Sequence, residues 1–519
     1  MTKIMTRPLH AALIVTLFGV TVPITNAHAE TPEIRYAEGA GTPTSMPGGR
    51  ARNTSTDNVL AHVVESLVAL KSDMSIGPML ADSWTVSDDG KTYTFKLREG
   101  VTFHNGEPMT SADVKWSYDF LTSKDSEYSC KNLYDGSKGA AVEGVGTPDP
   151  QTVVFHLTEP YALFLDQLAS VQCPMAVLNK SSLNADGSWN KPVGTGPYVF
   201  SDWKKDQYLL LTPYAGYKPR AEAPSGMAGR KEAHAAVRFV VIPDAAAQKA
   251  ALMAGQVDAY NADDDNLPAR DPRWNIVKED GLDTVTLLMQ TKDPLLQDVR
   301  MRRAIALALD FPAIAKALTN GQAPYNPSLV ATASSFYSDA DKQGYAKNLE
   351  EVQQLLKQAG YQGQTLHLQT NKRYPYMYRV AVVTQQLLAK AGIKTSLDML
   401  EWGTQLSNFR EGKFQMMAFA YSARTEPALM YRDVLGDKSK SPMAQWENPQ
   451  AQEWLNSIEG QSDVAARRAV FDQLHAAMIN DVPLLMYYNK PGHVIVSSHL
   501  HGFTGWPLRK PRFFNVTKQ

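Results

Sequence analysis

Short segments in which apolar and polar residues alternate recur along the first half of the chain and predict β-strands. In residues 93–97 the apolar side chains fall on every second position, the period of a strand with one buried face, and a further strand is predicted over 151–157. The turn residues Ser-Asp-Asp-Gly precede the first of these strands at 87–90. The remaining elements predicted in this half are strands over 208–212, 237–242 and 283–289 and helices over 111–120 and 245–254.

After residue 290 the pattern changes, and helices alternate with strands. A helix over 345–359 is predicted from an apolar stripe, with Gly360 in the position that commonly ends a helix. The order strand, helix, strand over 365–400 predicts an α/β arrangement with parallel pairing. Further helices are predicted over 298–309, 312–318, 449–458 and 464–479 and further strands over 414–419 and 483–488, whereas the last thirty residues are predicted to be irregular.

An apolar run near the N-terminus predicts a secretory signal peptide. Residues 11–20 follow a weakly basic start and are too few to span a bilayer comfortably. Ala27 and Ala29 place small residues where a signal peptidase reads them, so cleavage is expected near Ala29, before Glu30. The alternative is an N-terminal membrane anchor. We therefore expect an exported, soluble, periplasmic protein.

Composition and charge narrow the class of partner. The 519 residues are 44% hydrophobic and 20% charged, as in globular proteins, and the length suggests two or three domains. Because 52 basic residues balance 53 acidic ones, the net charge is −1. Such a chain lacks the basic excess that binds nucleic acid or anionic membranes.

The two cysteines, Cys130 and Cys173, can form a disulfide in an oxidising compartment. The chain-entropy model gives such a cross-link about 4 kcal/mol of stabilisation. The alternative is two separate buried thiols.

No common catalytic or metal-binding motif is present. The sequence lacks Gly-x-Ser-x-Gly, a Walker loop, His-Glu-x-x-His and Cys-x-x-Cys. His499 and His501 form only a weak metal pattern, and the acidic triplet 263–265 lacks the spacing of a calcium loop. We therefore expect no enzyme activity, cofactor or metal, although paired carboxylates of a hydrolase could be distant in sequence.

Three segments together resemble one family. Residues 80–114 (from Leu-Ala-Asp-Ser-Trp to Ser-Ala-Asp-Val), 194–203 (Gly-Thr-Gly-Pro-Tyr-Val-Phe-Ser-Asp-Trp) and 298–310 (Asp-Val-Arg-Met-Arg-Arg-Ala-Ile-Ala-Leu-Ala-Leu-Asp) are similar to the extracellular solute-binding proteins, family 5, of the peptide/opine/nickel class of ABC importers. The order and spacing of the three segments fit, and the resemblance covers essentially the whole mature chain.

The resemblance implies a two-lobed α/β periplasmic binding protein fold of the cluster C type. Lobe I would contain residues 30–284 and 490–519, with an extra small subdomain inserted at about 76–193, and lobe II residues 285–489. Two crossovers, near 283–286 and 488–493, would join the lobes. The ligand would bind between the lobes, which close by hinge bending, and a membrane permease and ATPase complex would receive the closed state.

Candidate ligand residues lie in two loops of the expected second lobe. Arg373 and Tyr374 follow a predicted strand and precede a helix, where α/β folds place ligand loops. By resemblance, Arg373 is similar in position to an arginine that holds the substrate carboxylate in dipeptide-binding members. The alternative is a solvated arginine.

The second loop departs from the family pattern. Members that grip a free ammonium group have an aromatic residue, two small residues and an aspartate. Here Tyr421, Ser422 and Ala423 match, but Arg424 stands in the fourth position. A guanidinium suits a carboxylate or phosphate, so this departure predicts an anionic ligand group. Glu426 is a further candidate, and the alternative is that Arg424 folds back onto it.

Other candidates carry weaker indications. Trp402 could stack on the ligand or pack in the core. Thr54, Asp57 and Asn58 match a region that lines the cleft in relatives. The combined prediction is a monomeric receptor, without catalysis, for a peptide or peptide-like solute with an anionic group, such as an acidic peptide, an opine or a phosphorylated conjugate. The alternatives are a secreted hydrolase and a sensory or chaperone-like periplasmic protein on the same fold.

Overall fold

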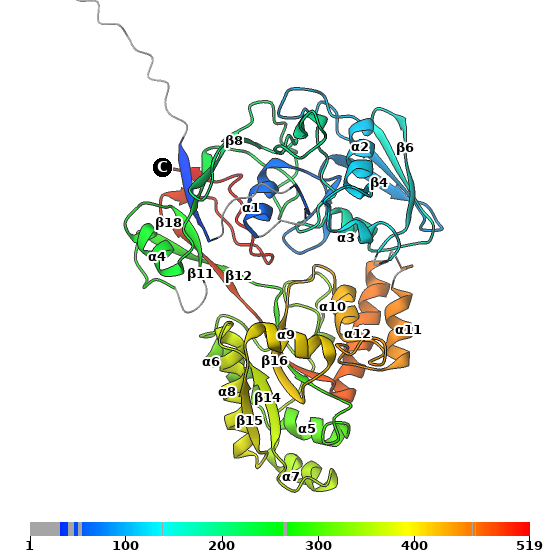
Figure 1. The fold of residues 1–519 in the computed structure, drawn as a ribbon, viewed down its shortest axis with the longest axis vertical. Helices are drawn as coiled ribbons and strands as arrows, with labels where there is room; N and C mark the ends of the chain where they lie inside the picture. The colour runs from blue at the N-terminus through cyan, green and yellow to red at the C-terminus, as the bar shows by residue number, and fades with distance from the viewer. Residues whose placement is uncertain are drawn as a thin grey trace, which may run out of the picture. The chain divides into compact units, whose positions relative to one another are not determined.

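The computed structural model describes residues 32–39, 46–49, 54–137, 139–262, 267–458, 460–461 and 463–519 (Figure 1). The predicted signal peptide and the acidic triplet 263–265 lie outside these residues. Within the described ranges, no helix is long and apolar enough to cross a membrane.

A seven-stranded sheet contains strands from the N-terminal, middle and C-terminal parts of the described chain. Its strand order is β12-β18-β11-β1-β10-β9-β8, and β1 is parallel to both β10 and β11. Two helices lie in the segments that connect strands of this sheet: α1 (Thr54–Val63) follows β1, and α4 (Ala245–Met253) lies between β10 and β11. The strands are β1 (Glu33–Glu38), β8 (Tyr198–Lys204), β9 (Tyr208–Pro213), β10 (Ala236–Val241), β11 (Ala259–Ala262), β12 (Trp274–Glu279) and β18 (Gly492–Ser497).

The position of β18 corrects the prediction that the last thirty residues are irregular. It pairs antiparallel with β11 and with β12, and Figure 1 shows it between them. Only Val494, Ile495 and Val496 form its apolar run, which is too short to predict a strand alone. Backbone hydrogen bonds from the two flanking strands stabilise β18, although its own apolar run is short. Two short strands, β19 (Leu500–His501) and β20 (Thr517–Lys518), follow.

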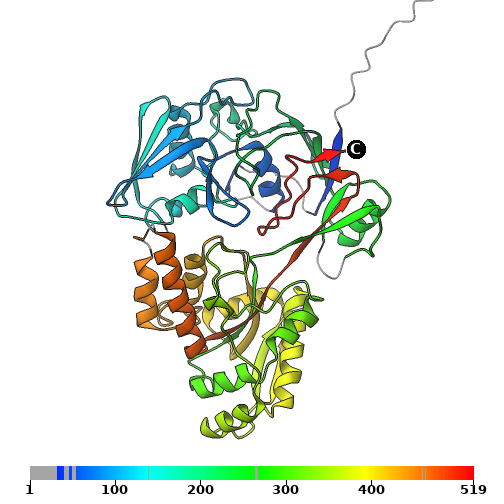
Figure 2. The same cartoon turned by 180° about the vertical axis from the view of Figure 1, so that it is seen from behind.

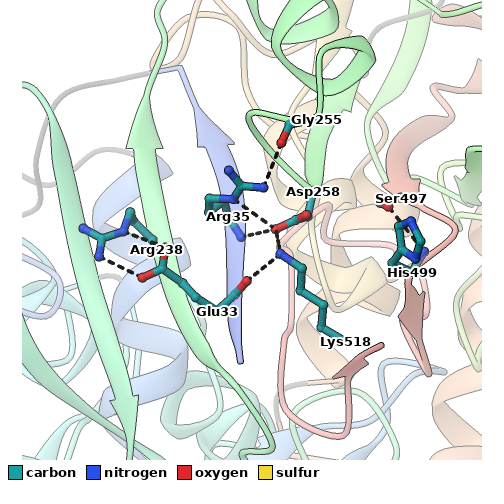
Figure 3. A network of polar contacts seen from close by, with 8 residues as sticks. All are labelled: Glu33, Arg35, Arg238, Gly255, Asp258, Ser497, His499 and Lys518. Atoms are coloured by element: carbon teal, nitrogen blue, oxygen red, sulfur yellow. Dashed lines mark hydrogen bonds and ion pairs between the residues drawn. The ribbon is translucent and has the colours of Figure 1, made fainter. Parts of the chain in front are cut away.

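A polar network fastens the C-terminal end to this sheet (Figure 3). Lys518 Nζ is 2.8 Å from Asp258 Oδ2 and donates to the carbonyl oxygen of Glu33 at 2.7 Å. Asp258 Oδ2 also accepts from the backbone amide of Arg35 at 2.7 Å. Because Asp258 immediately precedes β11 and Glu33 begins β1, the network joins three segments that are distant in sequence.

A smaller four-stranded sheet, of order β4-β5-β7-β6, lies within residues 81–157. The predicted turn at 87–90 connects β4 to β5, with the amide of Gly90 donating to the carbonyl of Ser87 at 2.8 Å. Thr110 and Asp113 form a capping box at the start of α2. The elements of this region are β2 (Val68–Leu70), β3 (Ile76–Pro78), β4 (Ala81–Val86), β5 (Thr92–Leu97), β6 (Val142–Asp149), β7 (Thr152–Leu157), α2 (Ser111–Thr122) and α3 (Phe164–Leu168).

The second large sheet has five strands in the order β15-β14-β16-β13-β17. Strand β14 is parallel to β15 and to β16, which confirms the predicted parallel pairing. Strand β13 is antiparallel to β16 and β17. The strands are β13 (Thr284–Met289), β14 (Leu366–Thr370), β15 (Thr395–Met399), β16 (Met416–Tyr421) and β17 (Leu484–Asn489).

Eight helices of the described chain accompany the second sheet. Helices α8 and α6 pack against its strands, and α11 lies beside α12 (Figure 2). The helices are α5 (Val299–Leu307), α6 (Phe311–Leu318), α7 (Leu349–Gln358), α8 (Pro375–Lys390), α9 (Trp402–Glu411), α10 (Pro427–Val434), α11 (Pro449–Ser457) and α12 (Val464–Asp481).

The chain passes between the two large sheets at two short segments. Residues 280–283 lead from β12 to β13, and residues 490–491 lead back from β17 to β18. The two segments run close together, because the amide of Lys490 donates to the carbonyl of Asp283 at 2.7 Å. Both lie close to the crossovers expected from the sequence.

Candidate functional site

The candidate loops lie along one edge of the five-stranded sheet. Strands β15, β14 and β16 are parallel neighbours, so their carboxyl ends meet at the same edge. Residues 371–374, 400–401 and 422–426 follow these three ends. Strand β13 starts and β17 ends at this edge too, because Thr284 pairs with both Tyr421 and Asn489. The candidate loops therefore lie beside the segments that connect the two sheets.

The first loop is held in place by Asn371, which is fully buried. Its Nδ2 donates to Gln405 Oε1 of α9 at 2.7 Å, and its Oδ1 accepts from the backbone amide of Tyr374 at 2.8 Å. These bonds shape the turn into α8, where Tyr374 is the N-cap residue. Arg373 is exposed, and among the described residues its side chain makes no ion pair. Arg373 therefore offers its positive charge to solvent from a loop that hydrogen bonds hold in shape.

Aromatic side chains in and beside these loops pack against one another. Trp402 begins α9 and meets Tyr374 edge to face, with ring centroids 4.8 Å apart. Its other neighbour is Phe419, nearly parallel at 6.0 Å, and Phe419 contacts Tyr421 at 5.3 Å. Trp402 is only partly buried, so one part of it packs in this cluster while another part remains accessible for stacking. The sequence had left these two roles as alternatives.

Arg424 is engaged by a residue that sequence analysis did not select. Its Nη2 lies 2.7 Å from Asp433 Oδ2 on α10, and its Nη1 donates to the carbonyl oxygens of Ser422 and Ala423. Ser422 itself is exposed. The alternative pairing of Arg424 with Glu426 is wrong, because Arg424 contacts Asp433 instead. No local sequence pattern predicts a role for Asp433, because only the folding of α10 brings it close to this loop.

Glu426 has a structural role. Its side chain is completely buried and forms an ion pair with Arg467 of α12. Its second oxygen accepts from the amide of Ala428 at 2.6 Å and caps α10. Both oxygens bind groups of the protein, and a ligand contact of Glu426 stays a prediction. Burial favours the neutral carboxyl and raises the pKa of Glu426, and Arg467 opposes the rise.

Tyr421 carries a buried hydroxyl group at the end of β16. Its side chain is 5% exposed, and its hydroxyl has no hydrogen-bond partner among the described residues. Burial raises the pKa of Tyr421, and the nearby Asp433 carboxylate raises it further. The hydroxyl therefore stays protonated and can donate a hydrogen bond.

The candidates on α1 are directed into the protein. Asp57 is buried and lies 3.2 Å from Lys510 Nζ, and Asn58 Nδ2 donates to Glu38 at 2.8 Å. Burial raises the pKa of Glu38, and the bond from Asn58 partly offsets this rise. Thr54 is the first residue of α1, and its side chain lies outside the described atoms. The ligand contacts of Asp57 and Asn58 remain predictions.

The cysteines and the remaining polar patterns lie away from these loops. Cys130 and Cys173 are joined by a disulfide, with Cα atoms 6.0 Å apart. His499 and His501 follow β18 at the other large sheet. Across the described ranges, no group of three His, Cys, Asp or Glu side chains is placed to hold a metal ion.

The site is tied to the first crossover through Asp283. Asp283 Oδ1 accepts from the backbone amide of Ala423 at 2.8 Å, so the loop after β16 is bonded to the segment that enters β13. In the second crossover, Lys490 Nζ lies 5.0 Å from the ring centre of Tyr376 at the start of α8. A movement of either crossover would therefore displace residues in or beside the candidate loops.

Comparison with known proteins points to one family. The family model described as "Bacterial extracellular solute-binding proteins, family 5 Middle" matches residues 75–442. Heme-binding protein A of Haemophilus influenzae is 27% identical over 500 residues, which are 90% of this chain and 88% of that protein. The dipeptide-binding protein of Escherichia coli is 27% identical over 474 residues, or 85% of this chain and 86% of that protein.

A solved structure shows the same fold. The binding protein AgaA of A. tumefaciens R10, in complex with agropinic acid, is 25% identical and superposes with a TM-score of 0.68. The match covers 94% of this chain and 99% of that one. The predicted two-lobed α/β fold is confirmed.

Proposed function

The chain belongs to the bacterial extracellular solute-binding proteins of family 5, and we propose that it captures a peptide or peptide-like solute and delivers it, chemically unchanged, to an ABC importer. A permease and its ATPase would be the partners. Two relatives support this class of ligand, since one is named a dipeptide-binding protein and the other is solved in complex with agropinic acid. The proposal includes no catalytic step.

One observation supports the location of the ligand: an exposed arginine and an aromatic wall share the edge of the sheet from which the chain crosses to the other sheet. In α/β proteins, ligands bind outside the carboxyl ends of parallel strands. Trp402 and Tyr374 offer apolar faces there, and Arg373 offers a charge that no carboxylate of the described chain neutralises. A cleft closing on this edge would need a ligand anion to pair with Arg373.

The proposal extends to the layout of the chain. Lobe I would comprise residues 30–284 and 490–519, including the small subdomain at about 76–193, and lobe II residues 285–489. The sheet memberships support this division, because β12 and β18 belong to one sheet and β13 and β17 to the other. We further propose export to the periplasm after cleavage near Ala29, and a monomeric receptor.

Arg373→Ala tests the ionic contact. If Arg373 meets a ligand anion inside a closed cleft, its removal leaves that anion unpaired, and affinity should fall by about 2–5 kcal/mol. Mass spectrometry of the solute released from the purified protein identifies the ligand, and titration calorimetry then compares the variants.

Lys372→Ala is the matched control, because Lys372 is an exposed cation in the same loop. Equal loss of affinity in both variants would indicate only a general effect of charge. Unchanged affinity in Arg373→Ala would remove Arg373 from the site.

A further inference from the structure

Arg509 holds an unusual backbone conformation in the C-terminal segment that follows β19. Its φ angle is +56°, in the left-handed region that glycine adopts easily and other residues adopt only with strain. Other turns of this chain place glycine in that region, for example Gly255 and Gly412. A residue in a strained conformation persists because the surrounding structure enforces it, and such residues often have a functional role. A long charged residue at this position therefore points to a role for its side chain.

Buried residues on both sides fix the turn that carries Arg509. The amide of Arg509 closes the turn by donating to the carbonyl of Trp506 at 2.8 Å. Trp506 is fully buried, and its own amide donates to Glu279 Oε1 at 3.1 Å. On the other side, Lys510 Nζ lies 3.2 Å from Asp57 Oδ2, and both of these side chains are buried. These contacts enforce the strained conformation and fix the direction of the Arg509 side chain.

The side chain of Arg509 lies where the two crossovers approach each other. A Cβ atom at Gly492, where β18 begins, would lie 2.6 Å from Nε of Arg509 and 3.0 Å from its Cδ. A Cβ atom at Gly281, in the first crossover, would lie 4.0 Å from the same Cδ. That Cβ atom would also lie only 2.0 Å from the carbonyl oxygen of Lys490, in the second crossover. The two glycines therefore allow the crossovers to approach each other and leave room for the arginine beside them.

The charge of Arg509 faces Asp283, the last residue of the first crossover. Nη1 lies 3.9 Å from Asp283 Oδ2, and the two side chains are 24% and 30% exposed, so the opposite charges attract each other. The other carboxylate oxygen of Asp283 accepts from the amide of Ala423, and its carbonyl accepts from the amide of Lys490. Asp283 thus joins the first crossover to the second one and to the loop after β16, and Arg509 contacts this same residue.

We propose that Arg509 is a positioning residue: it links the C-terminal segment to both crossovers and, through Asp283, limits the movement of the candidate loop after β16. This inference rests on the proposed function and deepens it, because a receptor that closes on its solute needs crossovers that move within limits. Removal of the arginine side chain should loosen the crossovers and this loop together, while the two large sheets keep their stability.

Hydrogen–deuterium exchange of the purified mature protein, without added solute, tests this role. Arg509→Gly removes the long side chain, and glycine adopts the same φ angle without strain. We expect amide exchange to become about fivefold faster or more in peptides that cover 280–283, 421–425 and 488–492. Peptides elsewhere in the two large sheets should exchange as in the wild type, and the melting temperature should not fall.

Asp206→Gly is the matched control for the loss of a side chain at a left-handed position. Asp206 is exposed and has a φ angle of +57° in the turn between β8 and β9. The same replacement at Asp206 should leave amide exchange at the crossovers equal to that of the wild type.

Gly492→Ala tests the same contact without changing Arg509. The three atoms nearest to the new methyl group all belong to Arg509, so this side chain has to move away. We expect the same peptides to exchange faster, and this variant decides the proposal if Arg509→Gly does not fold. In the double variant the methyl group has no arginine to displace, so exchange should match that of Arg509→Gly alone.

Three results would overturn the role of Arg509. The first is unchanged exchange at the crossovers in both single variants, and the second is a double variant in which the two effects add. The third is faster exchange throughout the protein with a lower melting temperature, since this would show a general loss of stability. These measurements involve no solute, so a protein that fails to capture one would refute the proposed function without altering them.

Discussion

At the scale of single residues, Glu279 is a buried carboxyl group in an unusual electrostatic position. It ends β12, immediately before the first crossover, and is 2% exposed. One oxygen accepts from the amide of Trp506 at 3.1 Å, and the other has no hydrogen-bond partner among the described residues. Burial raises the pKa of Glu279 to about 7, and Arg509 and Arg512 limit the rise.

A pH dependence of stability follows from Glu279. Its folded-state pKa of about 7 lies above the ordinary value of 4.5, so the folded state holds its proton more tightly. The stabilisation is complete below about pH 4.5 and is lost as the pH rises through about 7. Between about pH 5 and about pH 8, urea unfolding should show a loss of stability that is smaller by roughly 1–3 kcal/mol in Glu279→Gln than in the wild type. Part of the loss remains in the variant, because burial also raises the pKa of Glu426 to about 7.

The neighbouring Asp280 provides the control. It is exposed and pairs with Lys278, so Asp280→Asn should keep the pH dependence of the wild type. An identical pH profile for Glu279→Gln and the wild type would contradict the assignment.

At the scale of elements, the sequence predicted the second sheet better than the first. The parallel strands β14 and β15 and helix α8 were visible because long apolar patterns alternate with Gly360 and Gly392. Strands β1 and β18 were missed, since each is short and depends on neighbours far away in the chain. The loop holding Arg373 was predicted from strand-to-helix order, and the loop holding Arg424 from its resemblance to a family pattern. Asp433 and the pairing of Glu426 with Arg467 arise from tertiary packing alone.

The pair of Glu426 and Arg467 connects α10 to α12. Both side chains are buried, so removing one charge leaves the other without compensation. At about pH 8, Glu426→Gln should lower the free energy of unfolding by about 3–5 kcal/mol, measured by urea denaturation. Glu411→Gln, which removes an exposed partner of Lys413, should leave stability unchanged. A similar small effect in both variants would show that the buried pair does not hold these helices together.

At the scale of the whole molecule, two connecting segments join the two large sheets beside the edge that carries the candidate loops. The crossovers are bonded to each other through Asp283 and Lys490 and to the loop after β16 through Ala423. Contacts also run between the two parts outside the crossovers, since Ser335 donates to the carbonyl of Asp73 at 3.1 Å. A change in the position of one sheet relative to the other would therefore also move the candidate loops.

The crystal structure of the protein with its captured solute tests this account most directly. We predict one solute, chemically unaltered, with an anionic group on Arg373 and a face against Trp402. A solute bound away from the carboxyl edge of the five-stranded sheet, or one converted to a product, would contradict the account.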